Sequence, residues 1–372
     1  MTVPRPDYSD CLANFAVSIL NAFGVRTEGR GGIPDCTAMM EKPYRNVVVL
    51  LLDGMGTAIV EQNLSPGGFF RRHYLRSYSS VFPPTTVAAT TSILSGLEPV
   101  AHSWLGWDCY YPAIGENVTV FRNTLQGTTA PAAPYNVAQT FCGYTSILEQ
   151  IRQHGGQAFE VSPFAAPNPR TADALFRRIR EVCALPGRKF VYAYWPEPDG
   201  TMHRTGVTSP ETKAVLSELE EKAALLSASL EDTLLIVTAD HGQRNARGAV
   251  LTDYPALAEC LERMPSIEPR ALNLYVKAGM AERFRTLFLR EFGDSFWLLS
   301  RQQVQENGLF GRDTPHPEFA GMLGDFLAVA TGDLAIYRSR EEADAFIGVH
   351  AGLTRQELEI PLIVCTGGQG CE

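Results

Sequence analysis

Three short runs of the sequence are almost entirely apolar, and each is followed within a few residues by aspartate or histidine. They cover residues 46–52 (NVVVLLL), 189–194 (KFVYAY) and 233–238 (TLLIVT). Strands without alternating polar residues are typical of a parallel sheet that helices cover on both faces. Amphipathic helices are predicted at 171–183 and 210–230, between these runs. The sequence therefore predicts an α/β fold with a mostly parallel central sheet flanked by helices.

The remaining segments extend this pattern but do not all fit it. We expect further helices at 11–23, 85–94 and 146–154, and further strands at 76–82, 158–161 and 360–365. Residues 101–133 are rich in glycine and aromatic residues and are predicted to form a long loop. Residues 249–346 mix strand-like and helical pieces without simple alternation. We therefore expect a single domain over residues 1–372, with a small inserted cap region within 249–346.

Composition limits the classes of function. The formal net charge of −9 argues against general nucleic-acid binding, which needs a basic surface. It allows a phosphate-ester substrate, because bound metal ions can reverse the local potential. Residues 1–10 lack the features of a signal peptide, and no apolar run near the start could span a membrane. The eight cysteines are scattered without a CxxC pair, so we expect a cytoplasmic protein with free thiols and no membrane partner.

Metal-ligating side chains are concentrated at the ends of the predicted strands. Asp53 directly follows residues 46–52, and Asp240 and His241 follow residues 233–238, where Gly242 would permit a sharp turn. Asp199 and His203 are spaced to face the same side of one helical turn. His350 lies shortly before the last strand. Each residue also has a structural interpretation: Asp53 could cap the following helix, and a lone histidine is usually structural.

Thr86 is the candidate nucleophile. It lies at the predicted start of helix 85–94, where free N–H groups and the helix dipole favour phosphate oxygens. An N-cap role is the alternative. The helix carries an unusual number of hydroxyl side chains, which lower helix propensity and indicate a polar face beside a ligand; they are Thr85, Thr86, Thr90, Thr91, Ser92 and Ser95.

Taken in order, these motifs resemble the alkaline phosphatase superfamily, and within it the type I phosphodiesterase/nucleotide pyrophosphatase branch. The resemblance covers most of the chain as an ordered set of motifs rather than as continuous identity. It is carried by FPPTTVAATTSILSGLEPVAHS (82–103), EPDGTMHRTG (197–206), TADHGQ (238–243) and GVHAGLTRQELEIPLIV (348–364).

The resemblance implies two divalent metal ions and a role for each candidate. Asp199, His203 and His350 would hold one ion. Asp53, Asp240 and His241 would hold the other, with Thr86 as a further ligand and as the nucleophile that forms a phospho-threonine or nucleotidyl-threonine intermediate. Mixed nitrogen and oxygen ligands suit zinc, which the family makes the first choice, and also manganese or iron.

One departure from the family pattern concerns the substrate. Members of the branch usually carry an asparagine three residues after the nucleophile, where this chain has Ala89. This departure puts a nucleotide substrate in doubt more than it does the phosphoryl chemistry. We expect a small phosphate-ester substrate, with a nucleotide as one candidate. The aromatic residues that follow could stack on a base or an aryl leaving group, with ordinary loop packing as the alternative; they are Trp104, Trp107, Tyr110 and Tyr111.

Other functions fit the same core. A metal-dependent phosphomutase or a phosphonate hydrolase of the superfamily would use these ligands, and a binding protein without turnover could retain them. Hydrolysis is favoured over the mutase because ordinary strand and helix elements occupy the interval between Thr86 and Asp199, where mutases usually have a large inserted domain. The sequence leaves the substrate, the metal and the oligomeric state open.

Overall fold

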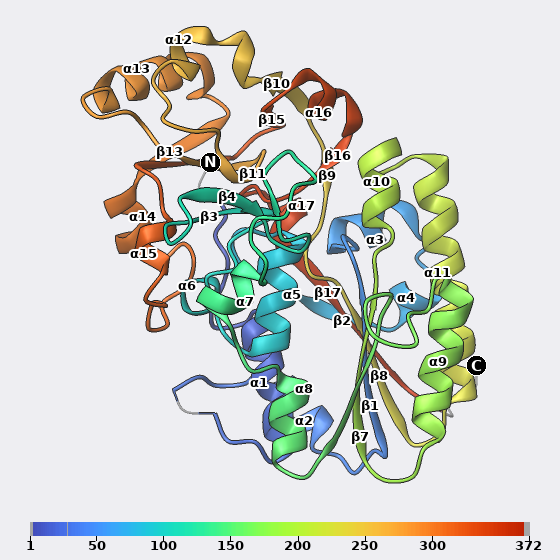
Figure 1. Cartoon of the computed structure of the whole chain (residues 1–372). Helices are drawn as coiled ribbons and strands as arrows, with labels where there is room; N and C mark the ends of the chain where they lie inside the picture. Colours follow the sequence, from blue (N-terminus) through green and yellow to red (C-terminus); the bar gives the residue numbers. More distant parts are fainter. Residues whose placement is uncertain (1–2, 28, 368–372) are drawn as a thin grey trace.

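The computed structural model describes residues 3–27 and 29–367 and contains a central sheet of six strands (Figure 1). Their order is β2-β17-β8-β1-β7-β6, in which β8, β1, β7 and β6 are parallel and β17 runs antiparallel to both β8 and β2. The mostly parallel α/β fold is thus confirmed. The strands are β1 (Asn46–Leu52), β2 (Tyr74–Ser79), β6 (Gln157–Val161), β7 (Lys189–Trp195), β8 (Thr233–Thr238) and β17 (Glu359–Thr366).

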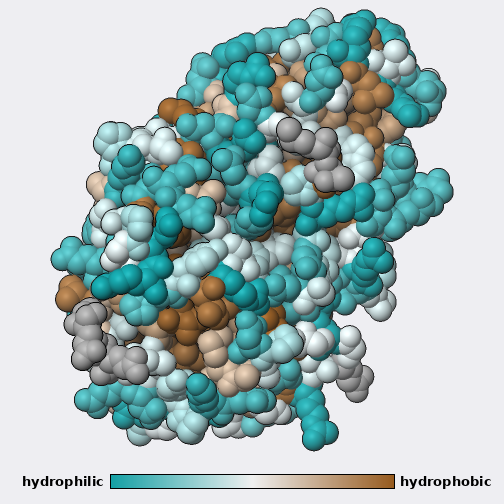
Figure 2. Space-filling view, turned by 180° about the vertical axis from the view of Figure 1, so that it is seen from behind, coloured by the Kyte–Doolittle hydropathy of each residue, from teal (hydrophilic) through white to brown (hydrophobic). Residues whose placement is uncertain are grey.

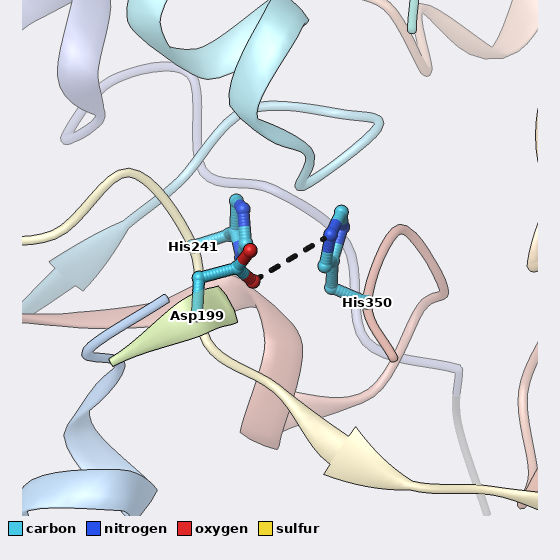
Figure 3. A group of neighbouring side chains, drawn as sticks. All are labelled: Asp199, His241 and His350. Atoms are coloured by element: carbon cyan, nitrogen blue, oxygen red, sulfur yellow. Dashed lines mark ion pairs between the residues drawn. The ribbon is translucent and has the colours of Figure 1, made fainter. Parts of the chain in front are cut away.

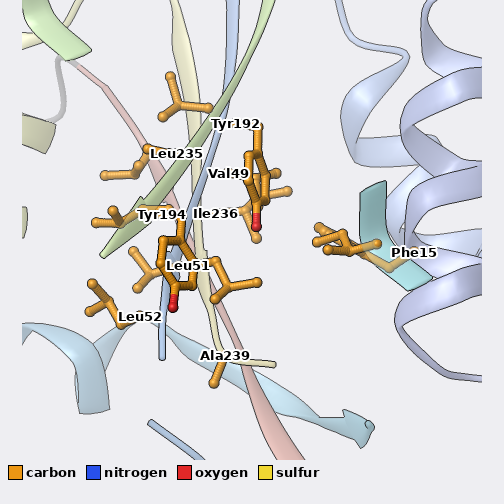
Figure 4. Close-up of a cluster of buried hydrophobic side chains, with 14 of the residues drawn as sticks. Phe15, Val49, Leu51, Leu52, Tyr192, Tyr194, Leu235, Ile236 and Ala239 are labelled. Atoms are coloured by element: carbon orange, nitrogen blue, oxygen red, sulfur yellow. The ribbon is translucent and has the colours of Figure 1, made fainter. Parts of the chain in front are cut away.

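Strand β1 lies in the interior of this sheet, between β8 and β7, and all seven of its residues are buried. Val49 is paired with Tyr192 on one side and with Ile236 on the other. Figure 4 shows these side chains stacked across the sheet, with Phe15 approaching from a helix. Branched and aromatic side chains project from both faces of the sheet. Because these apolar side chains must be shielded from water, helices are needed on both faces.

Helices do cover both faces, as Figure 1 shows. On one side lie α1 (Leu12–Ala22), α5 (Thr86–Ser95) and α8 (Ile147–Gln153), and on the other α9 (Ala172–Ala184) and α11 (Pro210–Ser229). The shorter helices are α2 (Pro34–Met40), α3 (Thr57–Asn63), α4 (Phe69–Arg72), α6 (Pro99–His102), α7 (Val137–Cys142), α10 (Asp199–Thr205), α12 (Pro255–Ala258), α14 (Arg301–Asn307), α15 (Phe319–Met322), α16 (Arg340–Ala345) and α17 (Arg355–Leu358), with a 3₁₀ turn at Leu251–Asp253.

A second sheet of seven antiparallel strands, in the order β13-β14-β12-β11-β3-β4-β5, lies beside the first. Most of it comes from residues 249–346, and α13 (Ala281–Phe292) contributes to the hydrophobic cluster on one of its faces. Its strands are β3 (Asp108–Tyr111), β4 (Glu116–Thr119), β5 (Thr124–Leu125), β11 (Ser266–Glu268), β12 (Ala271–Leu274), β13 (Phe296–Ser300) and β14 (Phe326–Ala330). That residues 249–346 form a separate cap stays a prediction.

The prediction of a long loop at 101–133 was wrong, since β3, β4 and β5 lie within it. These strands are only two to four residues long, too short to give a detectable period. Their sheet is completed by β11, where Ile267 is paired with Asp108 from a distant part of the chain. The small pairs β10 (Arg247–Val250) with β15 (Leu334–Tyr337) and β9 (Arg244–Asn245) with β16 (Gly348–Val349) complete the strands.

The outer surface is ordinary for a globular protein. The face seen in Figure 2 is mostly hydrophilic, with hydrophobic residues gathered in limited patches. Among the described residues, no helix combines the length and apolar character needed to cross a membrane. The seven cysteines within the described part of the chain are buried and free.

Candidate active site

Neighbouring parallel strands bring the predicted donors together. Leu52, the last residue of β1, is paired with Trp195 of β7, and Leu51 with Thr238 of β8. Asp53 and Asp240 each lie two residues beyond the paired residues Leu51 and Thr238, so they lie at the same edge of the sheet. This is the carboxyl edge, where open α/β sheets commonly bind ligands.

Two glycines allow the loops at this edge to approach one another. Gly54 has a φ of +72°, and a Cβ there would lie 2.9 Å from Cβ of Asp199. Gly242 was expected to permit a sharp turn, but its backbone is not left-handed. Its role is steric, because a Cβ on Gly242 would lie 2.0 Å from the carbonyl oxygen of Gln356. A side chain at either position would push the site apart.

Asp53, Asp240 and His241 form one group of possible ligands, and all three are buried. His241 Nε2 lies 3.4 Å from Asp53 Oδ1 and 3.6 Å from Asp240 Oδ2. The other ring nitrogen of His241 contacts the Gly242 carbonyl oxygen at 3.0 Å, which leaves Nε2 free to act as a ligand. Tyr194 donates a hydrogen bond to the second oxygen of Asp53. Asp53 does not cap the next helix, which begins at Thr57.

Asp199 is the centre of the second group. His203 Nε2 lies 3.2 Å from Asp199 Oδ2 across one turn of α10, and His350 Nε2 lies 3.8 Å from Asp199 Oδ1. Figure 3 shows Asp199, at the start of α10, beside His241 and His350, which lie in two separate loops. The rings of His241 and His350 are stacked with centroids 3.9 Å apart. His241 thus lies between the two groups.

Thr86 is the first residue of α5 and faces the first group. Its Oγ1 lies 3.2 Å from His241 Nε2 and 3.5 Å from Asp53 Oδ1. The N-cap position belongs to Thr85, whose side chain makes no cap hydrogen bond and donates instead to Glu268 at 2.6 Å. The Thr86 hydroxyl is therefore beside the acidic and imidazole groups rather than engaged in capping.

Acidic groups are crowded in this buried site. Burial, followed by the charge of Asp240, raises the pKa of Asp53 well above its ordinary value. Burial also raises the pKa of Asp240 to about 7, against the hydrogen bond that Gly54 N donates to it. Burial alone would lower the pKa of His203, but the Asp199 carboxylate outweighs it and raises that pKa to about 9. Cations are the natural complement of such a cluster.

The donors fit divalent metal ions. One buried polar atom at the centre, Asp240 Oδ2, has no hydrogen-bond partner among the described residues. Buried polar atoms normally have partners, so its lack of one here indicates a ligand that completes the site. Two sets of donor atoms each lie within 4.8 Å of one another and supply nitrogen and oxygen without thiolate: Asp53, Asp240 and His241, and Asp199, His241 and His350. The predicted ligand His203 belongs to neither set and contacts only Asp199 among the predicted ligands, at 3.2 Å. Zinc, manganese and iron accept such ligands.

The groups open into a cleft of about 750 Å³ that is lined by residues of α5, α10 and the second sheet. Of the four aromatic residues considered for stacking, only Trp107 lines this cleft. Trp104 is buried and donates from its indole to the Cys142 carbonyl oxygen, as ordinary loop packing requires. Tyr110 packs against Tyr275. His102 is also structural, because it is buried and hydrogen-bonds Ser92 Oγ through Nε2.

Three residues of the site were not predicted from the sequence. Gln243 donates to Asp199 Oδ1 at 2.9 Å, and Tyr194 binds Asp53 as described above. Glu268, at the end of β11, lines the cleft beside Thr85. The residue before Glu268 is Ile267, whose φ of 76° costs a β-branched residue about 1–3 kcal/mol.

The one sequence feature that could have indicated a role for Gln243 is its position directly after Asp240-His241-Gly242.

Comparison with known families gives this geometry its context. The profile of type I phosphodiesterase / nucleotide pyrophosphatase matches residues 47–352, most of the chain. The chain belongs to this family. It is therefore a hydrolase acting on phosphoester bonds, within the alkaline phosphatase superfamily. No curated protein sequence gives a significant match.

Solved structures of members of this family and of the superfamily have a similar fold. Murine ectonucleotide pyrophosphatase/phosphodiesterase 5 superposes with a TM-score of 0.68 at 18% identity, over 86% of this chain and 88% of that one. The human protein of the same name gives 0.66 at 16% identity, over 86% and 87%. Phosphonoacetate hydrolase from Sinorhizobium meliloti 1021 gives 0.62 at 17% identity, over 88% and 92%. At these identities the likeness establishes the fold.

Proposed function

We propose that this phosphohydrolase is a two-metal phosphodiesterase that uses Thr86 as its nucleophile. The observation that supports it most is the position of Thr86 Oγ1, 3.2 Å from His241 Nε2 at the junction of the two ligand groups. In this proposal Asp199, His203 and His350 hold one ion, and Asp53, Asp240 and His241 hold the other. His241 lies near both groups, so it could contact either ion.

The chemistry proposed is in-line displacement at phosphorus. The Thr86 oxygen forms a bond to phosphorus while the bond from phosphorus to the leaving oxygen breaks, and water then hydrolyses the phospho-threonine or nucleotidyl-threonine. Divalent cations, zinc first, would lower the pKa of the attacking hydroxyl and neutralise charge on the phosphoryl oxygens. The free N–H groups at the start of α5 offer hydrogen bonds to the same oxygens.

The structural neighbours support a small phosphate or phosphonate substrate. One solved form of the murine protein is an inactive threonine-to-alanine variant in complex with AMP. The bacterial phosphonoacetate hydrolase was solved with phosphonoformate. Because Ala89 occupies the position of the usual asparagine, phosphonate hydrolysis is the second candidate. A phosphomutase is the remaining alternative, and analysis of the reaction products would detect its activity.

The test is a metal analysis combined with matched substrates. We expect two metal ions per chain by mass spectrometry and faster hydrolysis of bis(p-nitrophenyl) phosphate than of p-nitrophenyl phosphate. Thr86→Ala should abolish turnover, whereas Ser95→Ala, at the opposite end of α5, should not. A preference for the monoester, cleavage of a carbon–phosphorus bond, or phosphate exchange between two hydroxyls of one sugar would each replace the diesterase proposal.

A further inference from the structure

Gln243 is a buried amide that connects the two groups of candidate ligands. The residue is only 1% exposed. It follows Asp240-His241-Gly242 in the chain, so it lies on the loop that carries two members of the first group. Its Nε2 donates a hydrogen bond of 2.9 Å to Oδ1 of Asp199, the central residue of the second group. A loop of one group therefore holds a carboxylate of the other.

The carboxylate of Asp199 depends on this contact for its orientation. Its Oδ2 lies 3.2 Å from His203 Nε2 and its Oδ1 lies 3.8 Å from His350 Nε2, so both oxygens face candidate ligands. Among the described residues, Gln243 provides the one hydrogen bond to this carboxylate that does not come from such a ligand. An imidazole nitrogen that binds a cation carries no hydrogen, so it cannot also donate to the carboxylate. The amide then keeps the carboxylate from turning.

The two carboxylates of the first group have partners of the same kind. Tyr194 donates to Asp53, and two backbone N–H groups donate to Asp240 at 3.1 and 2.9 Å. Such donors orient the ligands of a metal ion and increase the affinity of the site. Gln243 provides the equivalent contact for Asp199, and it is a side chain that can be replaced without changing a ligand.

The orientation of the Gln243 amide is set by the charge of Asp199. Reversal of the amide would place Oε1, rather than Nε2, 2.9 Å from a carboxylate oxygen, and two acceptors repel each other. In the favoured orientation Oε1 is buried and has no hydrogen-bond partner among the described residues. An unpartnered buried acceptor opposes folding, so an apolar residue of the same size would suit the core better. The contact with Asp199 therefore explains this glutamine better than core packing does.

We propose that Gln243 is a positioning residue that sets the affinity of the Asp199 group for its divalent cation. This inference rests on the two-metal site of the proposed function. The amide holds the carboxylate between His203 and His350, so that a cation meets ligands that are already ordered. Loss of such a donor commonly lowers metal affinity about 10- to 100-fold. The affinity of the first group should not change, because that group has its own donors.

Zinc titration of the metal-free protein tests the proposal. Zinc is added in competition with a chromophoric chelator, which gives the affinity of each site without reference to turnover. For the wild-type protein we expect two sites. Gln243→Met keeps the approximate size of the side chain and removes the donor. It should weaken one site about 10- to 100-fold and leave the other within about twofold of its wild-type affinity.

Two controls separate positioning from a general effect on the fold. Gln126→Met removes an amide that donates to another carboxylate of the cleft, that of Asp108 at 3.0 Å, and should leave both zinc sites unchanged. His203→Ala removes a candidate ligand of the second group, and adding Gln243→Met to it should not alter the site that remains. If Gln243→Met fails to fold, Gln243→Asn is measured against the same criteria, because its shorter side chain cannot reach Asp199.

The outcomes distinguish this proposal from the proposed function. Equal weakening of both sites by Gln243→Met would make the residue a structural one and overturn the proposal, and so would two unchanged sites. If one site is selectively weakened but the wild-type enzyme does not hydrolyse bis(p-nitrophenyl) phosphate, the diesterase proposal fails and the positioning role stands. If the diester is hydrolysed but neither site is selectively weakened, the positioning role fails and the diesterase proposal stands. A wild-type protein that binds fewer than two zinc ions would overturn both.

Discussion

Glu357→Gln should destabilise the protein strongly, because Glu357 ties the second sheet to the site. Both its side chain and that of Arg270 are fully buried. Glu357 accepts hydrogen bonds from Arg270 Nε at 2.7 Å and from Arg270 Nη2 at 2.8 Å. It also accepts them from Gly352 N at 2.7 Å and from Thr354 Oγ1 at 2.6 Å. Its backbone oxygen accepts from Gly242 N at 2.9 Å, next to His241.

The magnitude follows from these contacts. Glutamine keeps one acceptor oxygen, but its amide places a donor where the carboxylate accepted, and the Arg270 guanidinium is left without a counter-charge. Removing one partner of a buried pair costs about 3–5 kcal/mol. Against a typical free energy of unfolding of about 5–15 kcal/mol, the variant should still fold. With an m value of about 3 kcal/mol per molar of urea, the midpoint should fall by about 1 M or more.

Urea denaturation followed by far-UV circular dichroism measures this shift. Arg355→Gln, which removes the ion pair between the exposed Arg355 of α17 and Glu359, is the matched control and should cost about 0–1 kcal/mol. Replacing both Arg270 and Glu357 by methionine should recover part of the loss, because no buried charge remains. If Glu357→Gln shifted the midpoint no more than Arg355→Gln does, the buried pair would not be the structural link we infer.

Three further predictions concern the site. Thr86→Ala should retain two metal ions by mass spectrometry while losing diester turnover, since the carboxylate and imidazole ligands remain; loss of metal would assign it a larger ligand role. Asp240→Ala and His203→Ala should each lose metal as well as activity, and full occupancy in both would show the ligands to be misassigned. In metal-free protein, the pKa of Glu268 of about 7 lies above its ordinary 4.5. The unfolded chain therefore releases this proton first as pH rises, and wild type loses stability relative to Glu268→Gln between about pH 4.5 and 7. Melting temperatures measured across that range check it, and a constant difference would contradict the shift.

Helices and strands whose formation depends mainly on their own residues could be predicted from the sequence. The apolar runs predicted β1, β7 and β8 because a strand buried on both faces contains few polar residues. The four-residue spacing of Asp199 and His203 placed them on one helical turn, and they lie together on α10. Asp53 and Asp240 could be brought together because parallel strands share a carboxyl edge.

The second sheet and its contributions to the cleft could not be read in this way. Strands β3 to β5 are short, and β3, which joins them to the rest of the sheet, pairs with β11 about 160 residues further along the chain. The same pairing brings Glu268 to Thr85, and Arg270 reaches Glu357 across 87 residues. Nothing adjacent to these residues in the sequence marks them.

The sequence by itself thus determined the central sheet, the helices that cover it and the candidate ligands at the ends of its strands, because hydrophobic periodicity and strand polarity are local properties. Only the tertiary structure decided which wall faces Thr86, which carboxylate there accepts a hydrogen bond from Thr85 and which buried ion pair holds the loops. Those features depend on long-range pairing, in which burial and charge are set by residues far away in the chain.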